Sequence, residues 1–155
     1  MNDIKEKTVC FTGHRRVIHK YLPQKLDEII ETLIENGFIY FGTGGARGFD
    51  KLAAEAVIRA KEKHPHIKLI IVLPSKDSWD KWNVYDREEY MEIAKKADKV
   101  TALSDHYYKG CMHARNKHLA DGSSVCVSYR YSSYGGTAFT EDYARKKGLT
   151  IVSVI

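Results

Sequence analysis

The sequence FGTGGARGFDKLAAEAV, residues 41–57, joins an apolar run to a helical pattern through four glycines within seven residues. Glycine is unfavourable inside a helix or strand, so such a cluster marks a turn whose backbone needs unusual freedom. One explanation is a tight surface turn. The other is a backbone that lies against an anionic ligand at the start of a helix. In either case the stretch predicts a strand–turn–helix unit.

The same order recurs along the whole chain. Short apolar runs predict strands at residues 8–11, 38–41, 68–73, 99–103, 124–128 and 149–154. Helical periodicity predicts helices at residues 22–34, 52–60, 85–97, 112–120 and 137–147. This alternation predicts an α/β fold, a Rossmann-like doubly wound and mainly parallel sheet with helices on both faces and the first strand central.

Length and composition are typical of one globular domain. No repeat, low-complexity tract or linker divides the 155 residues, so we predict a single domain over residues 1–155. The hydrophobic content is 43% and the charged content 29%. The longest apolar run, residues 69–73, is too short to cross a bilayer, and the N-terminus has no apolar signal segment. We therefore expect a cytoplasmic protein that does not engage a membrane.

The cysteines and histidines argue against a metal centre. Cys10, Cys111 and Cys126 form no Cys-x-x-Cys pair, so we predict neither a disulfide framework nor a zinc ribbon. Cys10 and Cys126 fall in strand-like runs and should be buried, whereas Cys111 lies in a polar segment and should be more exposed. The three histidines within residues 106–118 have no carboxylate at a supporting spacing. We predict no metal site.

The candidate ligand-binding residues follow strands or open the next helix. Ligands of doubly wound sheets bind at the carboxyl ends of the strands, and the net charge of +5 is compatible with an anionic ligand. The candidates are Thr12, Gly13, His14, Arg15, Gly42, Thr43, Gly44, Gly45, Arg47, Gly48, Asp50, Arg115, Asn116, Gly135, Gly136 and Thr137. Arg47 adds a positive charge inside the glycine turn, and Asp50 can accept hydrogen bonds from backbone N–H groups or a ligand hydroxyl. The spacing matches neither the dinucleotide fingerprint nor the P-loop.

Three motifs, in this order, resemble the SLOG superfamily. They are Gly-Gly-Ala-Arg-Gly-Phe-Asp at residues 44–50, Arg-Asn-Lys-His-Leu-Ala-Asp at 115–121 and Gly-Gly-Thr at 135–137. This superfamily includes the DNA-processing protein DprA and the LOG phosphoribohydrolases. The segment Cys-Phe-Thr-Gly-His-Arg, residues 10–15, is most similar to its YpsA branch. The resemblance implies a Rossmann-like fold, a nucleotide or nucleotide-like ligand, no required cofactor and a homo-oligomer.

Resemblance to the LOG enzymes also implies candidate catalytic residues. Arg115 would hold a phosphate, and Glu141 or Asp142 would activate water or stabilise an oxocarbenium-like ribose. The chain departs from the LOG pattern at Tyr134, where a proline is expected, and at residues 138–139, where a second Gly-Thr is expected. These departures favour a binding protein over a hydrolase.

Three functions are therefore considered, in this order. The first is binding of a nucleotide or nucleotide-derived phosphorylated small molecule, as a sensor or regulatory module. The second is LOG-like N-glycosidase activity on nucleoside monophosphates. The third is DprA-like binding of single-stranded DNA, which ranks last because no companion nucleic-acid domain is evident in the sequence.

Aromatic residues cluster after the third predicted strand. Trp79, Trp82, Tyr85 and Tyr90 form either a lid that stacks on a base or an apolar cluster that holds a long loop down. We favour packing, because aromatic residues in loops often serve that purpose.

Overall fold

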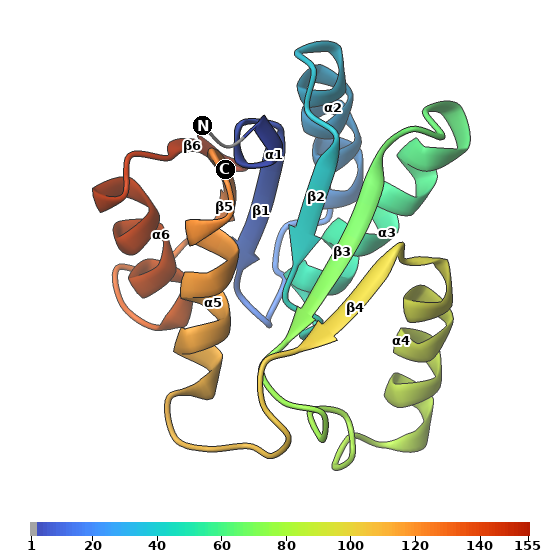
Figure 1. Cartoon of the computed structure of the whole chain (residues 1–155), viewed down its shortest axis with the longest axis vertical. Coiled ribbons are helices and arrows are strands. Elements are labelled where there is room, and N and C mark those ends of the chain that lie inside the picture. Colours follow the sequence, from blue (N-terminus) through green and yellow to red (C-terminus); the bar gives the residue numbers. More distant parts are fainter. Residues whose placement is uncertain (1–2) are drawn as a thin grey trace.

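One six-stranded parallel sheet runs through the computed structural model, which describes residues 3–155 (Figure 1). The strands are β1 (Thr8–Gly13), β2 (Tyr40–Thr43), β3 (Lys68–Leu73), β4 (Lys99–Ala102), β5 (Val125–Tyr129) and β6 (Thr150–Ser153). Their order across the sheet is β4-β3-β2-β1-β5-β6, and all five pairings are parallel. The prediction of a doubly wound α/β fold with the first strand in the interior of the sheet is confirmed.

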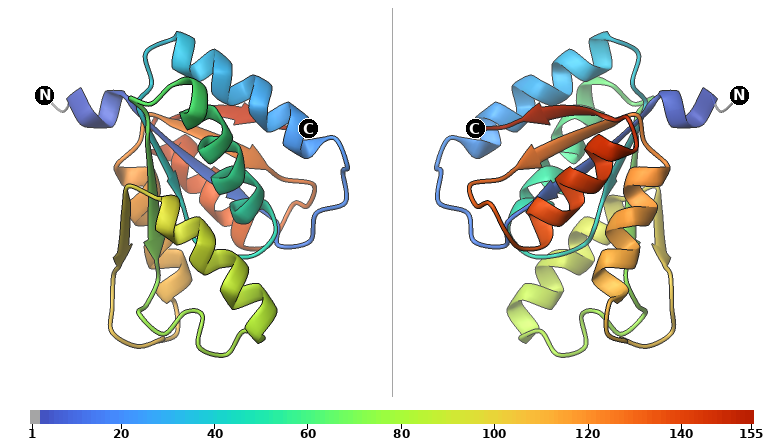
Figure 2. Two further views of the ribbon diagram at one scale, coloured as in Figure 1. Left: turned by 90° about the vertical axis from the view of Figure 1, so that its right-hand side faces the viewer. Right: turned by 90° about the vertical axis from the view of Figure 1, so that its left-hand side faces the viewer.

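Helices cover both faces of the sheet. They are α1 (Asp3–Glu6), α2 (Leu22–Glu35), α3 (Phe49–Lys63), α4 (Val84–Lys96), α5 (Cys111–Asp121) and α6 (Gly136–Lys146). The helices α2, α3 and α4 lie on one face and α5 and α6 on the other, as the two side views show (Figure 2). No helix within residues 3–155 is long and apolar enough to cross a membrane. The four-residue helix α1 was not predicted, because one turn is too short to show a period.

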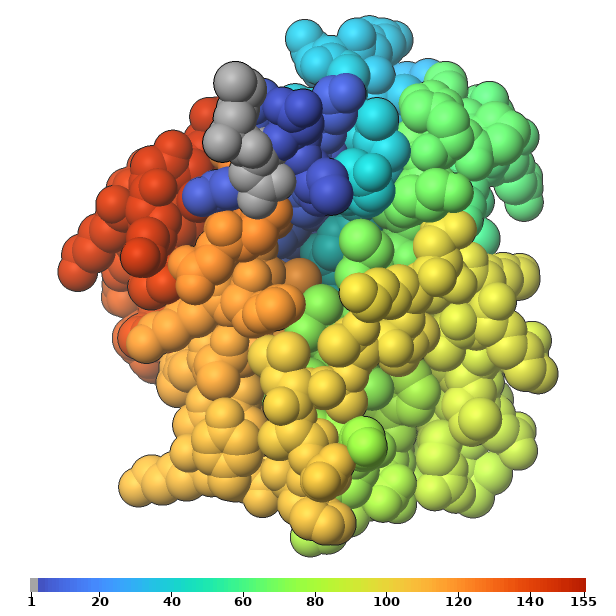
Figure 3. Space-filling model, viewed as in Figure 1, coloured from blue at the N-terminus to red at the C-terminus, as the bar shows by residue number. Residues whose placement is uncertain are grey.

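The two faces of the sheet carry separate apolar cores. The larger core lies between the sheet and α2 and α3, and Phe41 and Phe49 are completely buried in it. In α3, Ala53 is also fully buried, and its small side chain lets the helix approach the sheet closely. The smaller core includes Cys10 and Cys126, which face each other on β1 and β5. In the space-filling view, residues of α5 (orange) lie between α6 (red) and the β4 segment (yellow) (Figure 3).

All three cysteines are free and buried. This confirms the expectation for Cys10 and Cys126. The expectation of greater exposure for Cys111 is wrong, because its side chain is only 1% exposed. Cys111 is the first residue of α5 and lies against the protein interior, whereas the next two residues, Met112 and His113, are exposed.

The aromatic residues after β3 form a packed cluster. Trp79 lies with its ring centroid 5.2 Å from that of Tyr90 and 6.1 Å from that of Trp82. Its indole Nε1–H donates a 3.1 Å hydrogen bond to the carbonyl oxygen of Gly45. Tyr85 lies outside this cluster and is 73% exposed. The cluster therefore anchors the segment after β3 to the glycine turn after β2.

Candidate functional site

A cleft of about 470 Å³ opens at the carboxyl end of β1, among the first turns of α3, α5 and α6. The chain winds from β1 toward β4 on one side and adds β5 and β6 on the other, so this is the topological switch point of the sheet. The lining residues are Phe11, Thr12, Gly13, His14, Arg15, Ala46, Arg47, Asp50, Met112, His113, Arg115, Asn116, Gly136 and Thr137. The strand order therefore places the cleft where doubly wound sheets bind ligands.

The three helices around the cleft begin without side-chain caps. Their N-cap residues are Gly48, Gly110 and Gly135, with φ of 81°, 94° and 103°. By contrast α4, which lies away from the cleft, is capped by Asn83, whose side chain accepts a 2.8 Å hydrogen bond from the N–H of Asp86. The first N–H groups of a helix lack partners within the helix and carry partial positive charge. Three such helix starts give the cleft a positive potential without any side-chain charge.

The glycine turn is shaped by close contacts within the protein. A Cβ on Gly44 would lie 2.6 Å from Arg115 Cζ and 2.7 Å from Asp50 Oδ2. A Cβ on Gly48 would lie 2.0 Å from the carbonyl oxygen of Arg15, and this glycine has a φ of 81°. These glycines therefore let α3, α5 and the loop after β1 come together.

Arg115 is a buried cation beneath the cleft. It is 4% exposed, and its Nη1 donates hydrogen bonds to the carbonyl oxygens of Gly44 and, at 3.3 Å, Val72. Its Nε donates a 2.7 Å hydrogen bond to Oδ1 of Asn116. Burial lowers the pKa of Arg115, and the nearby charge of Asp50 opposes that shift. Within residues 3–155, Nη2 has no hydrogen-bond partner, so part of the guanidinium remains available.

Asp50 is the one acidic residue among those that line the cleft. It is 8% exposed, and its Oδ2 accepts a 3.2 Å hydrogen bond from the N–H of Ala46. Burial raises the pKa of the carboxyl group, while Arg115, the Ala46 N–H and Arg15 all act to lower it. The carboxylate thus closes the glycine turn and faces two cations.

Besides Arg115 and His113, three basic side chains line the cleft, and they differ in the contacts that they make with the rest of the chain. Arg47 lies over the ring of Trp82, 4.8 Å from its centroid, with Nη1 3.4 Å from Oδ2 of Asp86. His14 Nε2 accepts a 3.1 Å hydrogen bond from the N–H of Tyr131. Arg15 is exposed, and its side chain makes no hydrogen bond or ion pair with the part of the chain that the structure describes. Arg15 is therefore the cation most available to a ligand.

Glu141 and Asp142 lie outside the cleft lining. Glu141 Oε2 is 2.8 Å from Arg130 Nη1 and 3.3 Å from Arg145 Nη2. Asp142 Oδ1 is 3.1 Å from the same Arg130 nitrogen. Burial acts to raise the pKa of Glu141, but interactions with Ser128 and with the two arginines outweigh burial and lower it. Both carboxylates are therefore held in ion pairs beside the sheet edge.

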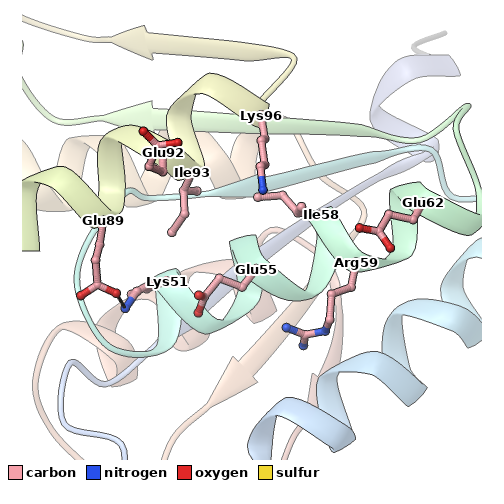
Figure 4. A pocket seen from close by; sticks show the side chains of 9 residues that line it. All are labelled: Lys51, Glu55, Ile58, Arg59, Glu62, Glu89, Glu92, Ile93 and Lys96. Atoms are coloured by element: carbon pink, nitrogen blue, oxygen red, sulfur yellow. Dashed lines mark hydrogen bonds and ion pairs between the residues drawn. The ribbon is translucent and has the colours of Figure 1, made fainter.

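A second hollow, of about 420 Å³, lies between α3 and α4 (Figure 4). Four of its lining residues are glutamates, namely Glu55, Glu62, Glu89 and Glu92. Lys51 points toward Glu89, and their charged groups are 2.7 Å apart. Carboxylates outnumber the three cations there, whereas three arginines and one carboxylate line the cleft at β1, so the cleft is the more favourable of the two for an anion.

The comparisons with known proteins identify the family. Residues 5–148 match the family model YpsA, described as the YspA SLOG family. The chain belongs to the YpsA SLOG family. The resemblance predicted from the sequence motifs is confirmed.

The YpsA SLOG chain matches curated relatives over most of its own length. It is 30% identical over 138 residues to UPF0398 protein BH1768 of Halalkalibacterium halodurans, covering 87% of this chain and 72% of that protein. It is 32% identical over 138 residues to the SPbeta prophage-derived protein YoqJ of Bacillus subtilis, covering 81% of each.

A solved structure shares the fold of this YpsA SLOG chain. It is DNA processing protein A from Helicobacter pylori, whose single-stranded DNA binding mode that structure describes. The TM-score is 0.71 at 21% identity, and the match covers 97% of this chain and 66% of that one. At this identity, the likeness concerns the fold alone.

The cleft of the YpsA SLOG chain brings together many of the predicted ligand-binding residues. Those in its lining are Thr12, Gly13, His14, Arg15, Arg47, Asp50, Arg115, Asn116, Gly136 and Thr137. Those outside the lining are Gly42, Thr43, Gly44, Gly45, Gly48 and Gly135. The first two belong to β2, the next three to the turn between β2 and α3, and Gly135 precedes α6. Sequence reasoning missed Phe11, Ala46, Met112 and His113. Met112 and His113 could have been predicted to line the cleft, because they lie in the first turn of the helix that carries Arg115.

Within residues 3–155, no group of three or more His, Cys, Asp or Glu side chains is arranged to hold a metal ion.

Proposed function

We propose that this chain binds a nucleotide or nucleotide-derived phosphorylated ligand in the cleft at β1, as a sensor or regulatory module. The observation that carries the proposal is the convergence of three helix starts without side-chain caps on one cleft. Helix N-termini favour phosphate groups because their N–H groups donate hydrogen bonds and the helix dipole favours negative charge.

The side chains of the cleft support the same ligand class. Arg15 has a free guanidinium at the rim, and Arg115 adds a buried positive charge below it. An arginine can donate two parallel hydrogen bonds to a phosphate, which fixes both its position and its orientation. The cleft volume of about 470 Å³ lies within the range of small-molecule sites.

The hydrolase alternative is less well supported. The carboxylates proposed for water activation, Glu141 and Asp142, are engaged by Arg130 and are not part of the cleft lining. A general base must come within hydrogen-bond reach of the water that it activates. We therefore expect no release of free base from AMP, measured by chromatography after prolonged incubation. Base release that disappears in Glu141→Gln would instead favour the hydrolase.

Single-stranded DNA binding is the second candidate. It is favoured by the fold shared with the H. pylori protein and by the net charge of +5. Binding through phosphate contacts weakens steeply as the salt concentration rises. Steep salt dependence with an oligonucleotide, together with no response to mononucleotides, would support this candidate over the first.

A thermal-shift screen tests the main proposal. A ligand that binds only the folded chain raises its melting temperature. We expect a rise with at least one 5′-mononucleotide, dinucleotide, cyclic nucleotide or phosphoribosyl compound, and expect Arg15→Ala to reduce it. The matched control is Arg59→Ala, which removes the same charge from an arginine that pairs with Asp27 away from the cleft. No shift with any of these compounds would contradict the proposal.

A further inference from the structure

The carboxylate of Asp50 is unexpected in a cleft that otherwise favours anions. It is the one acid in the lining, and it is almost completely buried. A buried charge is costly unless hydrogen bonds and opposite charges compensate it. The position therefore needs an explanation beyond attraction of a phosphate.

One oxygen of Asp50 has a structural role. Oδ2 accepts the hydrogen bond from the N–H of Ala46 and lies beside Gly44, so it holds the glycine turn in place. A carboxylate has about four acceptor sites, and the backbone N–H groups of Ala46 and Gly44 use at most two of them. The side chain also lines the cleft, so it can accept a further hydrogen bond from a ligand.

The surroundings of Asp50 define the kind of group from which its carboxylate can accept a further hydrogen bond. A second anion beside it is disfavoured by like-charge repulsion. An amino cation is disfavoured because Arg15, Arg47 and Arg115 line the same cleft. A neutral hydroxyl fits, because it donates a hydrogen bond to the carboxylate and brings no charge of its own.

We propose that Asp50 is a specificity-determining residue that accepts a hydrogen bond from a ribose hydroxyl, so that the cleft selects ribonucleotides over deoxyribonucleotides. This inference rests on the proposed function, since it takes the phosphate to be bound at the helix starts. It assigns the two ends of the ligand to different groups: the phosphate to Arg15 and the N–H groups, and the sugar to Asp50.

Titration calorimetry with sugar analogues tests the inference. The probes are AMP and GMP, each with its 2′-deoxy and 3′-deoxy counterpart. We expect the wild-type chain to bind at least one ribonucleotide about tenfold more tightly than the weaker of its deoxy counterparts, as for loss of a hydrogen bond to a charged group.

The variant Asp50→Asn removes the acceptor but keeps the shape of the side chain. Its amide oxygen can still accept the N–H of Ala46, which places an NH2 donor where Oδ1 was. We expect the ratio between ribo and deoxy ligands to fall to about threefold or less. The matched control, Asp27→Asn, changes an exposed carboxylate that pairs with Arg59, and should keep the wild-type ratio.

The outcomes separate this inference from the proposed function. If AMP or GMP binds, and both its 2′-deoxy and its 3′-deoxy counterpart bind as tightly, the inference is wrong and the proposed function stands. Retention of the wild-type ratio in Asp50→Asn also overturns it. If neither nucleotide nor any deoxy counterpart binds, the inference fails, and the thermal-shift screen with the wider set of compounds decides the proposed function. If Asp50→Asn does not fold, the comparison of ribo and deoxy ligands on the wild-type chain still tests the inference.

Discussion

Arg115 on α5 and Asp50 on α3 meet at Gly44, where the backbone between them has no room for a Cβ. The two helices lie on opposite faces of the sheet, so the contact joins both faces at the ends of the strands. Arg115 also donates to carbonyl oxygens of Gly44 and Val72, which lie at the ends of β2 and β3. The floor of the cleft is therefore one connected arrangement of buried charges and backbone.

Replacement of Gly44 by alanine should destabilise the fold. The added Cβ would overlap Arg115 and Asp50, and overpacking of this kind costs about 1–3 kcal/mol. Urea denaturation measures the loss. Gly136→Ala is the control, because a Cβ there would meet nothing within 4 Å. Equal stabilities for the two variants would show that the turn after β2 can relax.

Removal of the Arg115 side chain should be more severe. Arg115→Ala removes the cation that acts most strongly on the buried Asp50 carboxylate. It also removes the donor to the carbonyl oxygens of Gly44 and Val72, and each unsatisfied buried acceptor costs about 1–3 kcal/mol. The partner variant Asp50→Asn and the double variant complete a thermodynamic cycle. We expect a favourable coupling energy between the two sites. Additive losses of unfolding free energy would contradict the arrangement.

The stability of the fold should fall in mildly acidic solution, in part because of His14. Burial, reinforced by the positive charge of Arg130, lowers the pKa of His14 below its ordinary value of 6.5. The unfolded chain then binds more protons than the folded one, so the contribution of His14 is present above pH 6.5 and is lost as the pH falls through the lowered pKa.

The variant His14→Gln tests this pH dependence. Glutamine does not titrate, and its carbonyl oxygen can accept the N–H of Tyr131 in place of Nε2. Between about pH 7.5 and pH 5, the unfolding free energy of the variant should fall less than that of the wild-type chain. Parallel pH profiles would show that His14 is equally free to titrate in the folded chain.

Much of the fold could be predicted from local sequence. The glycine turn at residues 42–48 and the alternation of strands and helices indicate the parallel sheet, because backbone freedom and periodicity are local properties. The role of Arg115 could not be predicted in this way. Its carbonyl partners are 71 and 43 residues away in the chain, and only the assembled sheet brings them to the guanidinium.

The candidate site was predicted in outline for the same reason. Residues in the turns after strands or at the start of the next helix, such as Arg15 and Asp50, must lie near the carboxyl edge of a parallel sheet. The engagement of Glu141 and Asp142 by Arg130 depends on how α6 packs beside β5, which no spacing in the sequence encodes.

Thiol reactivity tests the burial of the cysteines. All three are buried, so a folded sample should react slowly with a thiol reagent, whereas a sample in guanidinium should release all three equivalents. Rapid reaction of one thiol in the folded chain, mapped to Cys111 by mass spectrometry, would contradict the burial of this side chain at the start of α5.

The most direct test of the central claim is an NMR titration of the 15N-labelled chain with AMP and GMP. We expect the largest amide shifts at residues 13–15 and in the first turns of α3, α5 and α6, with little change between α3 and α4. Shifts that cluster in the α3–α4 groove, or no shifts at saturating nucleotide, would contradict it.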